Sequence, residues 1–260
     1  MKTKNKMSKK KKIILSVTIA LLVAASIPPA VVFGRQAFCE GNKDQYSVAN
    51  TPTLENSSLN GKQIIFLGSS VTFGSASQGE SFVDFMAKRD GIVPIKEAVS
   101  GTTLVDNGKK SYIARMLTID PNLQADAFVC QLSTNDASKK MPLGEIVSGY
   151  KLEDFDTQTV AGAIEYIICY AKSTWDCPVI FYTGTQYKSE QYAKMVELLL
   201  QIQEKWDIGV IDLWNDAEMN AVSKEDYNLY MVNGIHPSKA GYRDWWTPKF
   251  ETYLTEYLAG

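Results

Sequence analysis

Four short polar segments lie after apolar runs that are predicted to form β-strands. They are Gly68-Ser69-Ser70, Ser100-Gly101, Ser133-Thr134-Asn135-Asp136 and Asn233-Gly234-Ile235-His236-Pro237. Ligands of open α/β sheets bind at the carboxyl ends of the strands, so we expect the four segments to meet there. Acyl transfer needs a nucleophile, a base and donors for the oxyanion. A serine, a histidine, an asparagine amide and backbone N–H groups near a glycine provide all three. Each segment alone is also compatible with an ordinary turn or helix cap; their joint presence favours the chemistry.

The single histidine of the chain restricts that chemistry. Any histidine-dependent step must use His236, and a metal site built from several histidines is excluded. The 27 Lys and Arg residues against 29 Asp and Glu give a formal net charge of −2, which offers no reason to expect nucleic acid. The sequence implies no metal and no organic cofactor.

Apolar runs and helical spacing alternate along residues 62–260. The predicted strands are Ile64–Leu67, Pro94–Val99, Ala127–Leu132, Pro178–Tyr182 and Ile208–Leu213. The predicted helices are Phe82–Arg89, Thr157–Thr174, Tyr192–Trp206 and Ser238–Leu258. Five strands that alternate with helices predict an α/β fold, with a five-stranded parallel sheet between two layers of helices. Trp245 and Trp246, in the last helix, are predicted to pack in the core.

The N-terminal residues predict a membrane segment. Residues 1–12 form a basic tail with seven lysines and no acid, and residues 13–33 are uncharged and long enough to cross a bilayer. The lysines would keep the tail in the cytoplasm, which places the rest of the chain outside. We therefore predict a single-pass anchor at the cell membrane; the alternative is a cleaved signal peptide and a secreted protein. Residues 34–61 are polar and predict a linker to the domain at 62–260.

Four cysteines leave two interpretations open. Cys169 and Cys177 are the most plausible pair for a disulfide outside the cell. Cys130 and Cys169 lie in apolar runs, however, which favours buried thiols in the domain and one further thiol at Cys39.

The four polar segments together resemble the blocks of the SGNH (GDSL-type) esterase and lipase family. Those blocks are a G-D-S turn, a glycine, a G-x-N-D segment and a D-x-x-H-P segment, and the resemblance runs in order from Ile64 to Pro237. It implies a flavodoxin-like α/β/α fold, with Ser70 as nucleophile and His236 as general base. It also implies an oxyanion hole made by the N–H groups of Ser70 and Gly101 and by the Asn135 side chain.

Three positions depart from the family pattern. Ser69 stands where the family has aspartate, and Ser133 stands where it has glycine. Asn233 replaces the triad acid, and an amide can orient His236 but gives it no negative charge. We therefore predict a working but weakened Ser–His pair, with Asp226 as an alternative source of the carboxylate.

Further polar and aromatic residues after strand ends are predicted to contact substrate. The candidates are Thr72, Thr102, Asp136 and Gln186, with Phe73 and Tyr187 nearby and Trp214 as a stacking surface for a sugar.

These features predict an extracytoplasmic serine esterase that hydrolyses short acyl esters, acetyl above all, on a small molecule or a glycan. An O-acyltransferase acting on cell-surface polysaccharide would use the same residues. Ser69 and Asn233 also leave open a non-catalytic, anchored glycan-binding protein. The expected partners are the ester substrate and, through the N-terminal segment, the membrane.

Overall fold

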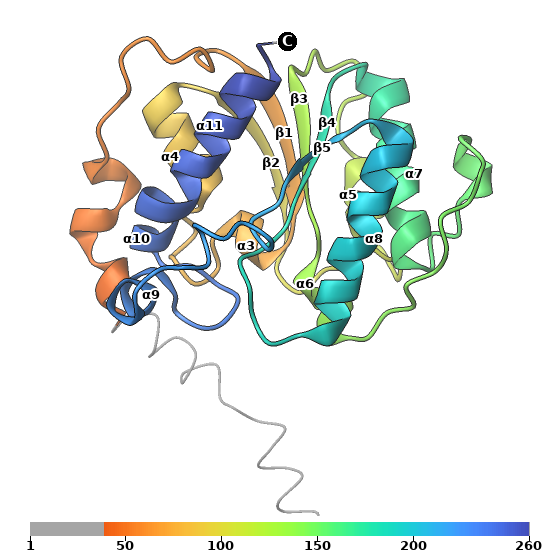
Figure 1. Cartoon of the computed structure of the whole chain (residues 1–260). Coiled ribbons are helices and arrows are strands. Elements are labelled where there is room, and N and C mark those ends of the chain that lie inside the picture. The colour runs from red at the N-terminus through yellow and green to blue at the C-terminus, as the bar shows by residue number, and fades with distance from the viewer. Residues whose placement is uncertain (1–38, 260) are drawn as a thin grey trace, which may run out of the picture. The chain divides into compact units, whose positions relative to one another are not determined.

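The computed structural model describes residues 39–259, in which five parallel strands form one sheet between two layers of helices (Figure 1). The strands are β1 (Gln63–Gly68), β2 (Val93–Ala98), β3 (Ala127–Gln131), β4 (Val179–Tyr182) and β5 (Gly209–Ile211). Their order is β2-β1-β3-β4-β5, and every pairing is parallel. This order is that of flavodoxin-like sheets. The predicted α/β architecture and its five strands are confirmed.

The helices differ widely in length. The α-helices are α3 (Ser70–Phe73), α4 (Phe82–Asp90), α5 (Tyr112–Met116), α6 (Thr134–Ser138), α7 (Val160–Trp175), α8 (Glu190–Trp206), α9 (Lys224–Tyr230), α10 (Lys239–Gly241) and α11 (Thr247–Tyr257). The 3₁₀-helices are η1 (Glu40–Asn42), η2 (Asp44–Tyr46), η3 (Val48–Asn50) and η4 (Leu152–Asp154), and η5 (Tyr242–Trp246) is a π-helical turn.

Alternate side chains of β1 enter two separate cores. Ile65 and Leu67 pack with α5, α7 and α8, whereas Ile64 and Phe66 pack with α4 and α11 on the other face (Figure 1). All four are 0% exposed. Burial of each such side chain contributes about 1.5–3 kcal/mol, and a register slip of one residue would exchange the faces of the whole strand. Packing on both faces therefore fixes the register of β1, and with it the position of Ser70 just beyond the end of the strand.

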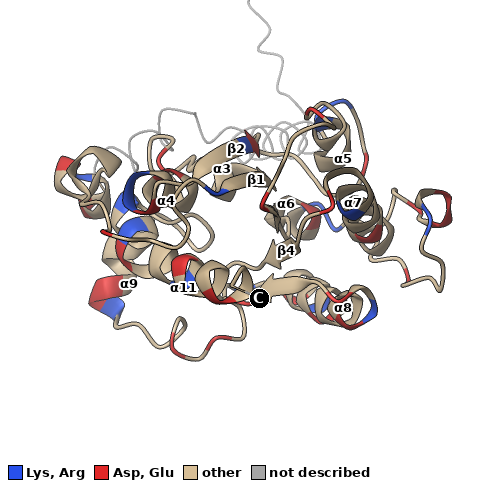
Figure 2. Ribbon diagram, turned by 90° about the horizontal axis from the view of Figure 1, so that it is seen from above, with Lys and Arg blue, Asp and Glu red and all other residues tan. Residues whose placement is uncertain are grey.

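Most charged residues lie outside the sheet, on the helices and loops (Figure 2). Figure 2 shows Lys, Arg, Asp and Glu on the helices and loops and, within the sheet, on the edge strand β2 alone, which contains Lys96 and Glu97. The inner strands are buried on both faces and carry no charge. Charges on an edge strand oppose pairing with another chain.

The helix predicted at Ser238–Leu258 is interrupted in the structure. It consists of α10, the π-helical turn η5 and α11 in succession, and the Thr247 N–H bonds to the Tyr242 carbonyl five residues back. Pro248 has no N–H to donate, so the wider turn occurs where the α-helical pattern cannot continue. Trp246 is 0% and Trp245 8% exposed, which confirms that both pack in the core.

The compact unit begins at Cys39, well before the predicted boundary at residue 62. Asn42, Ser47 and Thr51 are buried in η1 to η3 and the turn that follows, and Leu59 belongs to the core with 1% exposure. Residues 39–61 are thus part of the domain and not a free linker. The predicted segments at 1–12 and 13–33 lie outside the described residues. Within residues 39–259, no helix has both the length and the apolar character needed to span a bilayer.

All four cysteines are free thiols, so Cys169 and Cys177 do not form the disulfide considered above. Cys130 and Cys177 are buried, and burial raises the pKa of the Cys177 thiol to about 11. Cys169 donates to the Tyr150 carbonyl at 3.3 Å.

Candidate active site

Ser70 begins α3 directly after β1, at the carboxyl edge of the sheet. Its Oγ lies 2.8 Å from Nε2 of His236, although 166 residues separate the two in sequence. Ser70 is 8% exposed and His236 is half-buried. This distance is within the range of a nucleophile and its general base.

Asn233 lies on the other side of the imidazole ring. Its Oδ1 is 3.0 Å from His236 Nδ1, and the same oxygen accepts the backbone N–H groups of Ile235 and His236, each at 3.0 Å. Because a backbone N–H can only donate, these two bonds fix the amide with its oxygen toward the ring. Nδ1 therefore carries the hydrogen, and Nε2 keeps the lone pair that accepts the Ser70 hydroxyl.

The electrostatic setting of His236 follows from burial and from the lack of a nearby acid. Burial lowers the pKa of His236, and no carboxylate in the described part of the chain opposes that shift. Asp226, the alternative acid, is exposed in the first turn of α9, where it accepts the Ser223 hydroxyl at 2.9 Å. His236 is consequently a neutral base at pH 7, oriented by an amide alone.

Gln131 lies beneath the serine turn and is not among the residues predicted from sequence. Its Oε1 accepts the Ser69 N–H and the Thr72 hydroxyl, both at 2.9 Å, and the Thr72 hydroxyl is 2.7 Å from the Tyr182 hydroxyl. A Cβ at Gly68 would collide with the side chains of Thr72 and Gln131, so the close approach requires glycine. Thr72 was predicted to contact substrate, but its side chain is 0% exposed. It holds the serine turn in place instead.

The Gly101 loop and Asn135 are joined through Thr102. Asn135 Nδ2 donates to the Thr102 carbonyl at 2.9 Å, and its second amide hydrogen has no acceptor among the described residues. Gly101 has a φ of +81°, and its carbonyl accepts Lys139 Nζ at 2.9 Å. Within residues 39–259, the N–H groups of Ser70 and Gly101 donate to no protein acceptor. These free donors are of the kind that stabilises an oxyanion.

Ser133 and Asp136 both anchor the segment that carries Asn135. Ser133 Oγ accepts the N–H groups of Asn135 at 3.2 Å and Asp136 at 3.4 Å and so caps α6. With a φ of −74°, Ser133 occupies a conformation that needs no glycine. Asp136 is 0% exposed and accepts the N–H groups of Leu104 at 2.8 Å and Val105 at 3.1 Å. Burial raises the pKa of Asp136. Asp136 was predicted to contact substrate, but its buried carboxylate supports the loop at Leu104 and Val105 instead.

Arg115 is a buried cation between the serine turn and the Gly101 loop, with 7% exposure. Its Nη2 donates to the Gly68 carbonyl at 2.8 Å and to the Thr102 hydroxyl at 3.3 Å, and Nη1 donates to the Glu97 carbonyl at 2.6 Å. The Thr102 hydroxyl donates to the Val99 carbonyl, and Thr102 is 8% exposed, as Ser70 is, so its contact with substrate stays a prediction. Burial lowers the pKa of Arg115, but a guanidinium stays charged at any ordinary pH.

Residues 39–51, here termed the N-terminal strap, connect the serine and histidine loops. Asn42 Nδ2 donates to the Ala76 carbonyl at 2.8 Å, and Asn42 Oδ1 accepts the Lys239 N–H at 3.0 Å. Ala76 follows Ser70 in the loop before α4, and Lys239 is three residues beyond His236. The buried Asn42 amide thus links the loop that follows Ser70 to the loop that follows His236, and so helps to keep the two side chains close together.

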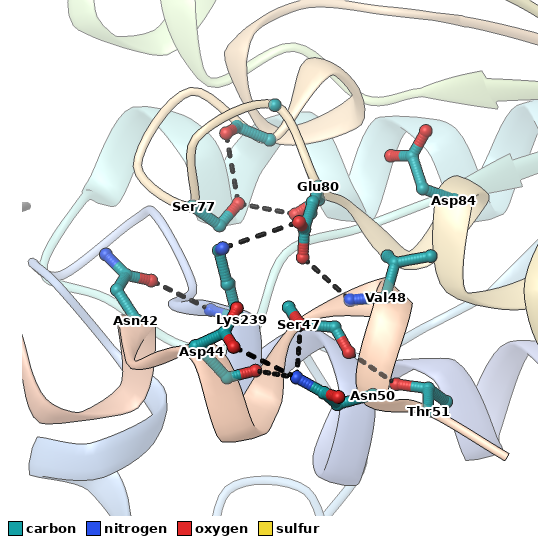
Figure 3. Close-up of polar contacts among 12 residues, drawn as sticks. Asn42, Asp44, Ser47, Val48, Asn50, Thr51, Ser77, Glu80, Asp84 and Lys239 are labelled. Atoms are coloured by element: carbon teal, nitrogen blue, oxygen red, sulfur yellow. Dashed lines mark hydrogen bonds and ion pairs between the residues drawn. The ribbon is translucent and has the colours of Figure 1, made fainter.

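Glu80 adds a second link between the N-terminal strap and these loops (Figure 3). Its carboxylate accepts the Val48 N–H at 2.9 Å and lies 3.4 Å from Lys239 Nζ. Lys239 is 5% exposed, so the ion pair is largely shielded from water. The strap, the Ser70 loop and the His236 loop therefore share one polar network.

The other predicted contact residues lie on the same edge of the sheet. Gln186 is exposed, and its N–H donates to Asn220 Oδ1 at 2.8 Å. Trp214 is only partly buried and packs edge-on against Tyr187, with ring centroids 5.6 Å apart. Phe73 is 45% exposed, three residues after Ser70.

A serine–histidine pair at the carboxyl edge of a parallel α/β sheet, with oxyanion donors beside it, defines an α/β serine hydrolase. The chain belongs to the GDSL-like lipase/acylhydrolase family, whose model matches residues 66–243. That range covers more than half of the chain and includes Ser70, Gly101, Asn135 and His236. The predicted family and the predicted enzyme class, a hydrolase of carboxylic esters, are both confirmed.

Several solved structures share the fold. A protein of Lactobacillus plantarum is 19% identical with a TM-score of 0.65, over 76% of this chain and 98% of its own. A lipolytic protein of the G-D-S-L family from Desulfitobacterium hafniense is 19% identical with a TM-score of 0.55, over 74% and 99%. An acetyl xylan esterase is 16% identical with a TM-score of 0.52, over 73% and 98%. No curated protein matches the chain.

Proposed function

We propose that the chain is an extracytoplasmic serine esterase that removes short acyl groups, acetyl above all, from a glycan. The catalytic part of this proposal rests on a chain of two hydrogen bonds. Ser70 Oγ lies 2.8 Å from His236 Nε2, and His236 Nδ1 lies 3.0 Å from Asn233 Oδ1. Buried supports under the turn, from Gln131 and Arg115, keep this arrangement rigid.

The proposed mechanism has two half-reactions. Ser70 Oγ attacks the ester carbonyl carbon while its proton passes to His236 Nε2, and the N–H groups of Ser70 and Gly101 with the Asn135 amide hold the oxyanion. The bond to the alcohol oxygen breaks as His236 returns the proton to that oxygen, which leaves an acyl group on Ser70. Water then gives a proton to His236 and attacks the acyl carbon; the acid departs and Ser70 regains its hydrogen.

Two features support a glycan ester as substrate. The fold is shared with an acetyl xylan esterase. Phe73, 45% exposed beside Ser70, presents an aromatic face of the kind on which sugars stack, and Lys96 Nζ lies 5.7 Å from its ring centroid. The location outside the cytoplasm rests on the basic residues 1–12 and the uncharged residues 13–33.

Hydrolysis of p-nitrophenyl acetate, butyrate and octanoate by residues 39–260 tests this proposal. We expect kcat/KM to fall with each longer chain, and acetate to be released from acetylated glycans. His236→Ala should lower turnover by roughly 10³-fold or more. Preference for octanoate, or undiminished turnover in His236→Ala, would contradict the proposal.

A further inference from the structure

A surface pocket of about 460 Å³ lies between the end of α6 and the start of α8 and is lined by Lys140, Lys188 and Lys194. We name it the lysine pocket after these three residues. Glu190 is its one acidic lining residue. Gln191 Nε2 donates to the Met141 carbonyl at 3.1 Å, which ties the two walls together. The pocket is therefore a feature of two packed elements.

The lysine pocket lies at the same end of the sheet as the candidate active site (Figure 1). In Figure 1, α6 and the start of α8 lie at the same end of the sheet as α3, which begins with Ser70. Asn135 lies on α6, two residues before the lining residue Ala137. Lys139 continues the basic surface toward the site, because its Nζ donates to the Gly101 carbonyl at 2.9 Å. A long substrate with its ester at Ser70 would reach the pocket.

The positive charge of the lysine pocket is not neutralised by the protein. Its three lysines are exposed, and none forms an ion pair or a side-chain hydrogen bond within residues 39–259. Eight of the 27 Lys and Arg and none of the 29 Asp and Glu precede Cys39, so residues 39–260 contain 19 basic and 29 acidic residues and carry a formal charge of −10. The domain as a whole is therefore negatively charged, whereas this pocket is surrounded by three unpaired positive charges.

Lys140 also occupies a backbone conformation that its residue type disfavours. Its φ is +52°, in the left-handed region just after α6, where glycine or asparagine is usual. Asp176 and Asp207 have the same conformation at the ends of α7 and α8. The Met141 N–H bonds to the Asp136 carbonyl at 2.9 Å, so this conformation of Lys140 ends α6 and fixes where its side chain starts.

We propose that the lysine pocket binds an anionic group of the substrate, so that the enzyme acts on a polyanionic glycan with carboxylate or phosphodiester groups. This rests on the proposed esterase function and names the substrate class of that site. Each ammonium at the surface adds a modest attraction that salt screens, and three around one pocket add up to a clear preference. Neutral glycans would gain nothing from the pocket.

Binding is measured with Ser70→Ala in residues 39–260, which form one compact unit and lack the lysines of residues 1–12. The probes are polygalacturonate, poly(glycerol phosphate) and neutral arabinoxylan in affinity electrophoresis. We expect retardation by at least one polyanion, and which one identifies the carboxylate or the phosphodiester. Adding Lys140→Glu, Lys188→Glu and Lys194→Glu should weaken it at least tenfold, as should 0.5 M NaCl.

The matched control places the same charge change elsewhere, in Lys88→Glu, Lys109→Glu and Lys224→Glu, at exposed lysines without an ion pair in the described residues. It should keep at least half of the affinity. Equal retardation by arabinoxylan, no retardation by either polyanion, or equal loss in the control would overturn the proposal. Binding by Ser70→Ala requires no turnover, so these outcomes are separate from a failure of the esterase assay.

Discussion

Asn233 Oδ1 accepts three hydrogen bonds at 3.0 Å, two from backbone N–H groups and one from His236 Nδ1. The backbone donors set the amide orientation, and the amide sets the imidazole tautomer. An asparagine can thus perform the orienting half of the usual aspartate role. The other half, stabilising the imidazolium by charge, is missing.

Asn233→Asp should restore that charge. The carboxylate can accept the same three hydrogen bonds and favours protonated His236, so it raises the pKa of His236, which burial lowers in the parent. Because the reaction needs neutral His236, the acidic limb of the kcat/KM profile should move to higher pH. Turnover at pH 8 should rise at least roughly tenfold. A pH–rate profile of both proteins checks this; an unmoved limb with unchanged turnover would show that Asn233 does not act through His236.

Asn42→Ala should lower kcat with little change in KM. It removes both bonds that join the Ser70 and His236 loops through the N-terminal strap, each worth about 1 kcal/mol. Asn42→Asp keeps the acceptor for the Lys239 N–H and loses the donor to Ala76, so its kcat should be intermediate.

The control for this prediction is Asn50→Ala in the same strap, because the Asn50 amide bonds only to Asp44 and Ser47 within it. Steady-state kinetics should leave the kcat of Asn50→Ala within twofold of the parent. An equal loss in both variants would show a general effect on folding instead of loop positioning.

Asp90→Asn should stabilise the protein at alkaline pH. Burial raises the pKa of Asp90 to about 6, with Glu251 adding to the shift, and Oδ2 has no partner within residues 39–259. A raised carboxyl pKa favours the fold fully below the unfolded value near 4, and this contribution is lost as pH rises through about 6.

Urea unfolding at pH 4, 6 and 8 tests this prediction. The variant should gain on the order of 1 kcal/mol over the parent at pH 8 and little at pH 4. Asp126→Asn is the contrasting variant, because Lys62 holds the pKa of Asp126 below its ordinary value, and this variant should lose stability at pH 8. A pH-independent gain in Asp90→Asn would contradict the assigned titration.

The sheet and the Ser70, Asn135 and His236 segments could be predicted from sequence because each has a local signal. The strands are short apolar runs, and the polar segments follow their ends. Gln131 was recognisable in principle, as a polar residue that ends an otherwise apolar strand. Arg115 lies in a five-residue helix that is too short to show a periodic pattern.

The N-terminal strap could not be recognised, because its burial depends on polar contacts. Three 3₁₀ turns have no apolar stripe, and the buried members are Asn42, Ser47 and Thr51. The burial of Thr72 and Asp136 was missed for a related reason. Position after a strand end places a residue at the correct edge of the sheet, but only the hydrogen-bond partners decide whether its side chain faces solvent or supports a loop.

The nucleophilic role of Ser70 is tested most directly by covalent labelling. Residues 39–260 would be incubated with a fluorophosphonate and the modified peptide identified by mass spectrometry. We predict one adduct, on Ser70, that is absent in Ser70→Ala and forms at least roughly 100-fold more slowly in His236→Ala. An adduct on another residue, or ester hydrolysis that persists in Ser70→Ala, would contradict the assignment.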